Sequence, residues 1–166
     1  GVELFAPKSK APQIWETFVQ NGAKPCGLGS RDLLRLEAGL LLHGNDMDIT
    51  INPFEAGLDR FVYCDKDDYL AGSALRKIRS EGPIKKLLGL YIIGNRVARS
   101  GYPLMHENKQ VGHITSGTYS PTLDRNIALG YVQTDLIDNH KGLKCDIRGQ
   151  LADVEVTALP FYSRNT

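Results

Sequence analysis

The sequence predicts an α+β protein in which helices precede a small antiparallel β-barrel. Before about residue 83, apolar side chains recur at helical spacing, whereas later residues form short β-prone runs separated by Gly, Asn and Pro. Several strands at this spacing indicate a small antiparallel barrel or sandwich, and we expect the barrel. The predicted parts are residues 1–82, with mixed α/β structure, and residues 83–166, with all-β structure.

Composition supports a folded chain with its own core. The 166 residues are 42% apolar and 23% charged, which is typical of globular domains. The formal net charge is only +1, so the composition does not suggest a protein that binds nucleic acid or an anionic membrane. No apolar run is long enough to span a bilayer, and the N-terminal residues do not have the pattern of a signal peptide.

The first residues predict a short strand followed by an amphipathic helix. Residues 2–6 are apolar and read as a strand. Residues 11–22 carry apolar side chains at helical spacing, and Pro12 suits the first helical turn. Asn21 and Gly22 then form a natural stop signal, so we expect the helix to end there.

Two further helices are expected before the boundary. The second opens with Ser30 as its N-cap and ends near Gly39. The third has Ser73 as its N-cap and closes at Gly82, directly before a proline. After the boundary, the β-prone runs are residues 86–94, 101–106, 110–117, 126–132, 142–149 and 151–161.

The sequence gives little support for a metal site. The cysteines are odd in number, widely spaced and without a Cys-x-x-Cys pair, so we expect three reduced thiols and no zinc or iron–sulfur centre. They are Cys26, Cys64 and Cys145. His43 lies near Asp46 and Asp48 but lacks a third ligand at a suitable spacing. We therefore interpret the two aspartates as residues that shape an Asx-type turn.

Two other motifs could suggest a phosphate-binding loop and a hydrolase nucleophile, but each lacks residues that such a site needs. Residues 27–30 (GLGS) place glycines before a helix, but the third glycine of a dinucleotide fingerprint and the Gly-Lys pair of a nucleotide loop are missing. A tight turn into the helix is the preferred interpretation. Ser116 and Ser120 lie outside any Gly-x-Ser-x-Gly context, so a hydrolase triad has no support.

Three stretches together resemble one known family. They are GLGSRDLLRLEAGLLLHGNDMD at 27–48, NPFEAGL at 52–58, and SGYPL with VGHITSGTYSPTLDRNIALGYV across 100–132. They follow the order of the glycine cleavage system T-protein (aminomethyltransferase) family, whose C-terminal half the chain resembles. Pro160 and Phe161 match the family's closing Pro-Phe.

The resemblance implies a fold and a reaction. In the family, three domains surround a folate, and this chain would supply part of the folate-binding α/β region and the C-terminal β-barrel. The implied reaction passes an aminomethyl group from the lipoyl arm of the H-protein carrier to tetrahydrofolate and releases ammonia. The chain begins at Gly1 without Met, and no residue corresponds to the family's catalytic aspartate, which belongs to the N-terminal half. We therefore expect no catalytic residue in this chain and no activity from it alone.

The resemblance also implies three folate-binding residues, Glu3, Arg31 and Arg164. A carboxylate such as Glu3 accepts two parallel N–H donors of a pterin, and the planar head of Arg31 suits a carboxylate tail or a ring carbonyl. The alternatives are a solvated Glu3 and an exposed Arg31 paired with Asp32 or Glu37. Asp32 itself favours capping the helix.

Two departures from the family pattern leave the donor open. Asn52-Pro53 replaces the usual Thr-Pro, and residues 59–61 replace a tryptophan-bearing stretch. A folate-dependent demethylase of the same superfamily and a non-catalytic folate-binding module therefore remain alternatives. We expect tetrahydrofolate and the lipoylated H-protein as partners, neither nucleic acid nor membrane, and a location in the bacterial cytoplasm or the mitochondrial matrix.

Overall fold

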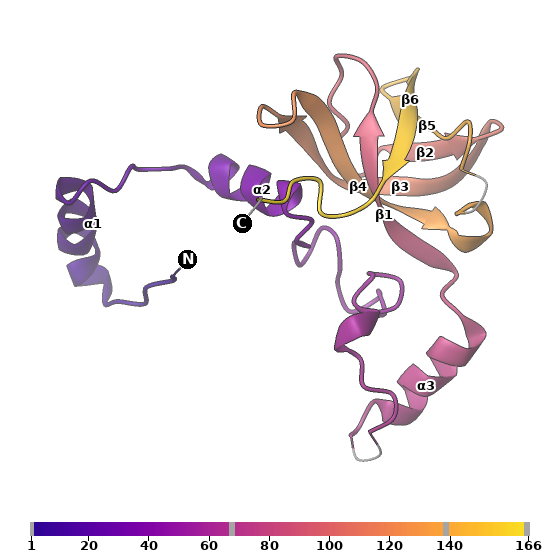
Figure 1. The fold of residues 1–166 in the computed structure, drawn as a ribbon, viewed down its shortest axis with the longest axis horizontal. Helices are drawn as coiled ribbons and strands as arrows, with labels where there is room; N and C mark the ends of the chain where they lie inside the picture. The colour runs from indigo at the N-terminus through magenta and orange to yellow at the C-terminus, as the bar shows by residue number, and fades with distance from the viewer. Residues whose placement is uncertain (1, 67–68, 138–139, 165–166) are drawn as a thin grey trace. The chain divides into compact units, whose positions relative to one another are not determined.

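The computed structural model describes residues 2–66, 69–137 and 140–164 (Figure 1). The chain divides into two compact units, residues 1–32 and residues 33–166. Among the described residues, no helix is long and apolar enough to cross a membrane.

Residues 1–32 contain a short 3-10 helix, Lys8–Lys10, and helix α1, Ala11–Gln20. Helix α1 confirms the prediction, with a proline in its first turn and a left-handed glycine, Gly22, directly after its end. The predicted strand over residues 2–6 is wrong, because this segment has no strand partner within the described part of the chain. An apolar run alone does not make a strand, since the ladder needs a second segment to complete its hydrogen bonds.

The second and third helices occur where they were predicted, but their caps differ. Helix α2 spans Leu28–Glu37, so Ser30 lies inside the first turn instead of capping it. Helix α3 spans Gly72–Glu81 and has Ala71 at its N-cap, without a side-chain hydrogen bond. Ser73 is therefore also inside its helix, because both helices begin before the serine that was expected to cap them. Gly82, with φ of 80°, ends α3 as predicted.

All six β-prone runs form strands, and these close into an antiparallel barrel. Strand β1 pairs with β4 on one side and β6 on the other, which gives the closed order β1-β4-β3-β2-β5-β6 (Figure 1). The strands are β1 Lys85–Ile92, β2 Pro103–His106, β3 Lys109–Ser120, β4 Arg125–Gln133, β5 Lys144–Ile147 and β6 Gln150–Thr157. Short 3-10 helices lie at Asp59–Phe61 and Thr134–Leu136. The predicted α+β fold with a small antiparallel barrel is confirmed.

Strand β4 is buried on both of its faces, from Asn126 to Val132. Alternate residues of a strand point to opposite faces, so Ala128 and Val132 join the barrel core while Ile127 and Leu129 join a second apolar cluster. This second cluster contains Leu36 of α2 and Phe161 of the C-terminal segment as well. One strand thus supports two cores, and the cluster that includes Leu36 attaches α2 to the barrel.

The C-terminal segment is held against the end of α2. The amide of Tyr162 donates a hydrogen bond to the carbonyl of Glu37 at 2.9 Å. The ring of Phe161 lies 5.9 Å from that of Tyr91 on β1. A side chain at Gly39, which has φ of 66°, would approach Leu159 closely. The tail is therefore part of the packed structure as far as residue 162.

Candidate functional site

A buried polar cluster joins α2, the loop after it and strand β3. At its centre the guanidinium of Arg35 and the carboxylate of Asp46 form an ion pair at 2.5 Å, with side-chain exposures of 9% and 0%. The same carboxylate oxygen accepts a hydrogen bond from the amide of Leu42 at 2.9 Å. Burial of a charge is costly unless the charge is paired and hydrogen-bonded, and here both conditions hold.

Strand β3 contributes two neighbouring side chains to this cluster. The Thr115 hydroxyl donates to Asp46 at 2.5 Å, and Arg35 donates to the Ser116 hydroxyl at 2.8 Å. Consecutive residues of a regular strand point to opposite faces, but the register between β3 and β4 shifts between Ile114 and Ser116. This β-bulge allows Thr115 and Ser116 to meet the same ion pair.

Two further hydrogen bonds extend the cluster across the barrel. The Ser120 hydroxyl, at the end of β3, donates to the buried carboxylate of Glu37 at 2.5 Å. The Tyr131 hydroxyl donates to the carbonyl of Asp46 at 2.8 Å. Burial, followed by the charge of Asp46, raises the pKa of Tyr131, so the phenol remains a donor at neutral pH. We call Arg35, Glu37, Asp46, Thr115, Ser116, Ser120 and Tyr131 the polar clamp.

Sequence reasoning missed the polar clamp. Asp46 was interpreted as a turn residue, and Ser116 and Ser120 were considered only as candidate nucleophiles. Asp48 does form the expected Asx-type turn, because its carboxylate accepts both the amide and the hydroxyl of Thr50. No sequence signal identifies the clamp, since Arg35 and Ser116 are 81 residues apart.

The three predicted folate-binding residues are exposed. Glu3 lies in the extended segment before the first 3-10 helix, Arg31 lies in α2, and Arg164 lies two residues after Tyr162. In the described ranges, no hydrogen bond or ion pair involves these three side chains. Glu3 and Arg31 belong to the first unit and Arg164 to the second, so their assembly into one site stays a prediction. Glu37, weighed as a partner of Arg31, is buried against Ser120.

The three cysteines lie in different surroundings. All three cysteines are free, with Cys26 exposed and Cys64 and Cys145 buried. Burial raises the pKa of the Cys145 thiol to about 11. Within the part of the chain that the structure describes, no group of three or more His, Cys, Asp or Glu side chains is arranged to hold a metal ion.

Comparison with known proteins identifies the family. The GCVT N-terminal domain matches residues 1–66, and the glycine cleavage T-protein C-terminal barrel domain matches residues 85–163. The chain belongs to the glycine cleavage T-protein family. The second match covers the whole barrel from the start of β1, and the first covers the helical region through α2 and the loop after it.

Individual relatives support the same assignment. The chain is 44% identical over 165 residues to an aminomethyltransferase of Prochlorococcus marinus (strain MIT 9313), and this match covers 99% of the chain and 44% of the relative. An aminomethyltransferase of Synechocystis sp. (strain ATCC 27184 / PCC 6803 / Kazusa) is 41% identical, with 98% and 44% covered. The chain therefore spans less than half the length of these relatives.

A solved structure supports the fold directly. The crystal structure of glycine cleavage system aminomethyltransferase T from Bartonella henselae matches with a TM-score of 0.77 and 32% identity. The match covers 82% of this chain and 39% of that chain. The closed barrel with its attached helices is thus a known T-protein architecture.

Several of the motifs that carry the family resemblance supply the polar clamp. RLEAG supplies Arg35 and Glu37, the Gly-Asn-Asp turn supplies Asp46, and the TSG stretch supplies Thr115 and Ser116. Motifs that lie far apart in the sequence therefore meet in one buried network. In this chain they fasten α2 and its following loop to the barrel, a structural role.

Proposed function

We propose that the chain is the C-terminal part of a tetrahydrofolate-dependent aminomethyltransferase of the glycine cleavage system. The aminomethyl group on the lipoyl arm of the H-protein carrier passes to tetrahydrofolate. The methylene carbon forms bonds to two nitrogens of tetrahydrofolate, while its C–S bond to the lipoyl arm and its C–N bond to the amino group break. The two N–H protons of tetrahydrofolate pass to the sulfur and to the amino group, so the products are methylenetetrahydrofolate, ammonia and the dihydrolipoyl arm. The observation that carries the proposal is the 44% identity to relatives named aminomethyltransferase along 99% of this chain.

Glu3, Arg31 and Arg164 are the residues assigned to folate. The Glu3 carboxylate accepts adjacent N–H groups of the pterin, and the guanidinium of Arg31 donates to the glutamate tail or a ring carbonyl. Arg164 supplies a second guanidinium from the C-terminal segment. Support comes from their exposure and from the absence of other polar partners among the described residues, which leaves their donors and acceptors available to a ligand.

The catalytic aspartate is assigned to a part of the enzyme outside this chain, which matches only 44% of the relative's length. The residues of this chain then bind and orient folate, and the proton-accepting group near the pterin comes from elsewhere. On this proposal the chain alone produces no methylenetetrahydrofolate. The proposed location is the bacterial cytoplasm or the mitochondrial matrix, where the thiols stay reduced.

Complementation in trans tests this proposal. The chain is mixed with the part of the Prochlorococcus marinus (strain MIT 9313) enzyme that precedes the matched segment, together with aminomethylated lipoyl carrier and tetrahydrofolate. We expect methylenetetrahydrofolate and ammonia from the mixture and neither from the chain alone. Product from the chain alone would contradict the assignment of the catalytic aspartate.

Folate binding to the same mixture separates the alternatives. Arg31→Ala is expected to weaken the Kd for tetrahydrofolate by about tenfold, the loss of a charge-assisted hydrogen bond, whereas Arg79→Ala on α3 leaves it unchanged. Binding without turnover would favour a non-catalytic folate-binding module. Product from a methylated donor, but not from the aminomethylated carrier, would favour a folate-dependent demethylase. A mixture that neither binds folate nor forms product would refute the proposal.

A further inference from the structure

Three arginines line one hollow at an end of the barrel. Arg96 and Arg99 belong to the loop between β1 and β2, and Arg148 belongs to the turn between β5 and β6. These two connections lie at the same end of the barrel (Figure 1). The hollow has a volume of about 400 Å³, and Tyr102 and Gln150 supply its other polar side chains. None of its described lining residues is acidic.

The three guanidiniums form no ion pair with a carboxylate of the described residues. Ion pairs elsewhere in the described ranges involve other residues, and Arg96, Arg99 and Arg148 take part in none of them. Asp146, at the end of β5, accepts the amide of Gly149 at 2.6 Å and is not among the residues that line the hollow. The described lining of the hollow therefore carries three positive charges and no negative one.

Two of the guanidiniums are already oriented. Arg99 donates to the carbonyl of Gly117 at 3.2 Å, and Arg148 donates through Nε to the hydroxyl of Tyr102 at 3.1 Å. A guanidinium has five N–H donors, so each of these single bonds leaves most donors available. A ligand that binds here loses less side-chain entropy than it would against unrestrained arginines.

Composition does not explain this concentration of charge. The whole chain has a net charge of only +1, and like charges that share a hollow repel one another. A bound anion removes this repulsion, and guanidiniums form paired hydrogen bonds with the oxygens of phosphate and carboxylate groups. The volume is at the small end of the range for ligand pockets, which favours a compact molecule.

We propose that this hollow, the arginine hollow, binds a small multivalent oxyanion that carries two or more phosphate or carboxylate groups. Three arginines supply three positive charges and more N–H donors than one carboxylate accepts, which favours a ligand with two or more anionic groups. The site is distinct from Glu3, Arg31 and Arg164, and it does not depend on the proposed transferase reaction.

Calorimetric titration of the 166-residue chain with inorganic pyrophosphate, and separately with citrate, tests the proposal. An ionic strength of about 0.1 M limits the effect of distant charges, because the Debye length is then about 10 Å. We expect saturable binding of at least one of the two anions. Tighter pyrophosphate binding assigns the site to phosphate compounds, and tighter citrate binding assigns it to polycarboxylates. Failure of both to saturate the chain would refute the proposal.

Charge-matched variants locate the binding. Arg96→Gln with Arg148→Gln is expected to weaken the Kd about tenfold or more. The control, Lys109→Gln with Lys141→Gln, removes the same charge near the β2–β3 end of the barrel and should leave the Kd within about twofold. If both pairs of variants weaken the Kd equally, the anion is attracted by the overall charge of the chain and not by the arginine hollow, and the proposal is overturned.

A third pair of variants tests for the paired hydrogen bonds. Arg96→Lys with Arg148→Lys keeps the charge but loses the planar fork, so we expect an intermediate loss of affinity. Affinity equal to that of the unmodified chain would overturn the assignment of paired guanidinium contacts. Thermal unfolding followed by circular dichroism confirms that each variant is folded, which is expected because all four substituted residues are exposed.

Discussion

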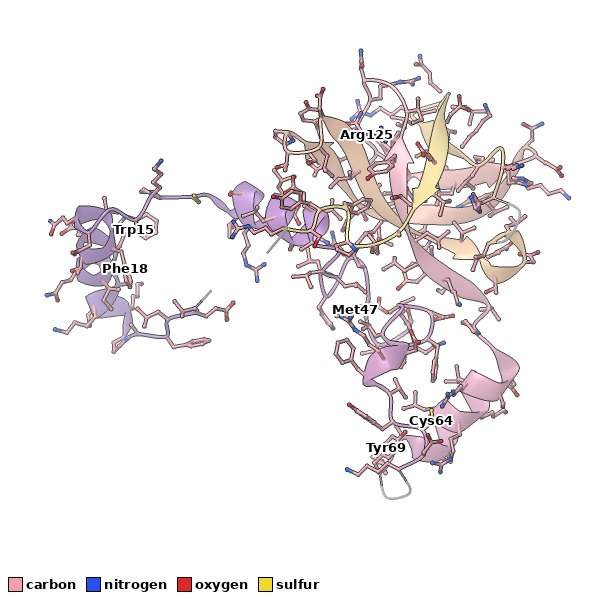
Figure 2. All side chains as sticks on the ribbon, viewed as in Figure 1. Trp15, Phe18, Met47, Cys64, Tyr69 and Arg125 are labelled. Atoms are coloured by element: carbon pink, nitrogen blue, oxygen red, sulfur yellow. The ribbon has the colours of Figure 1, made fainter. Side chains whose placement is uncertain are left out.

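Residues 2–32 and residues 33–164 both have the apolar spacing of regular secondary structure, but they differ in how far their apolar side chains are buried. Helix α1 has the apolar periodicity of a packed helix, yet Trp15 remains 57% exposed and Phe18 52% exposed (Figure 2). In the second unit, Leu90, Leu104 and Ile114 are completely buried in the barrel. Amphipathic spacing predicts that a helix forms, whereas burial of its apolar face requires a partner surface that spacing does not supply.

The second unit differs in its polar groups too. The polar clamp places two carboxylates and a guanidinium out of water, and each is satisfied by side chains from other segments. In the first unit, the Thr17 hydroxyl of α1 instead donates a local hydrogen bond to the carbonyl of Gln13, one turn earlier in the same helix. Single substitutions in the polar clamp should therefore lower the stability of the second unit strongly. Substitutions in α1 should have the smallest effect on it.

The largest expected effect is that of Asp46→Ala. This change leaves Arg35 buried without its carboxylate partner and removes the acceptor of Leu42 and Thr115, so unfolding should become easier by about 3–5 kcal/mol. Denaturant unfolding followed by circular dichroism measures the change. Asp48→Ala is the matched control, because that exposed carboxylate bonds only Thr50, and its cost should stay within about 1 kcal/mol. Equal costs would show that the clamp does not stabilise the barrel.

The next effect is that of Ser120→Ala. The buried Glu37 carboxylate loses a hydroxyl donor, and the amide of Leu123 loses its acceptor, which should cost about 1–3 kcal/mol. Ser100→Ala, in the exposed loop before β2, should change the free energy of unfolding by less than about 0.5 kcal/mol. If Ser120→Ala lowers the free energy of unfolding no more than Ser100→Ala does, the hydrogen bond between Ser120 and Glu37 does not stabilise the fold.

Alkaline pH should weaken the barrel through Cys145. Its folded-state pKa of about 11 lies above the ordinary value of 9.0, so the folded state keeps a proton that the unfolded state releases. Stability is fully present below pH 9 and is lost as pH rises toward 11, at about 1 kcal/mol per pH unit near the middle of this window. The raised pKa of Tyr131 adds to the loss above pH 10.

Cys145→Ala tests this assignment. The variant should be less stable at neutral pH because a buried side chain is shortened, but its stability should fall less steeply between pH 9 and 10. Denaturant unfolding at several pH values measures both slopes. An unchanged slope would mean that another group dominates the alkaline loss.

The smallest expected effect is that of Trp15→Ala. Its side chain is more than half exposed, so the free energy of unfolding of the barrel should change by less than about 0.5 kcal/mol. Trp15 is the only tryptophan, so its fluorescence reports on the first unit alone. In Asp46→Ala, the loss of barrel structure should precede any change in this fluorescence. A large effect of Trp15→Ala on barrel unfolding would contradict this prediction.

Several features could be predicted from local sequence because their causes are local. Helical spacing located α1, and the Gly82 stop signal located the end of α3. The caps were less predictable, since Ser30 and Ser73 have the right chemistry but lie inside the first turns. Many positions near a helix start accept a serine, and the first hydrogen-bonded turn decides which one becomes the cap.

By itself, the sequence determined the helices, the six β-prone runs and the family, whereas the assignment of Glu3, Arg31 and Arg164 to folate stays a prediction. Only the tertiary structure decided that β1 pairs with both β4 and β6, that residues 2–6 find no strand partner among the described residues, and that a β-bulge brings Thr115 to Asp46. The physical reason is range. Helix periodicity and turn chemistry act over a few neighbouring residues, whereas strand partners and buried ion pairs join positions tens of residues apart, and their choice depends on the packing of the whole unit.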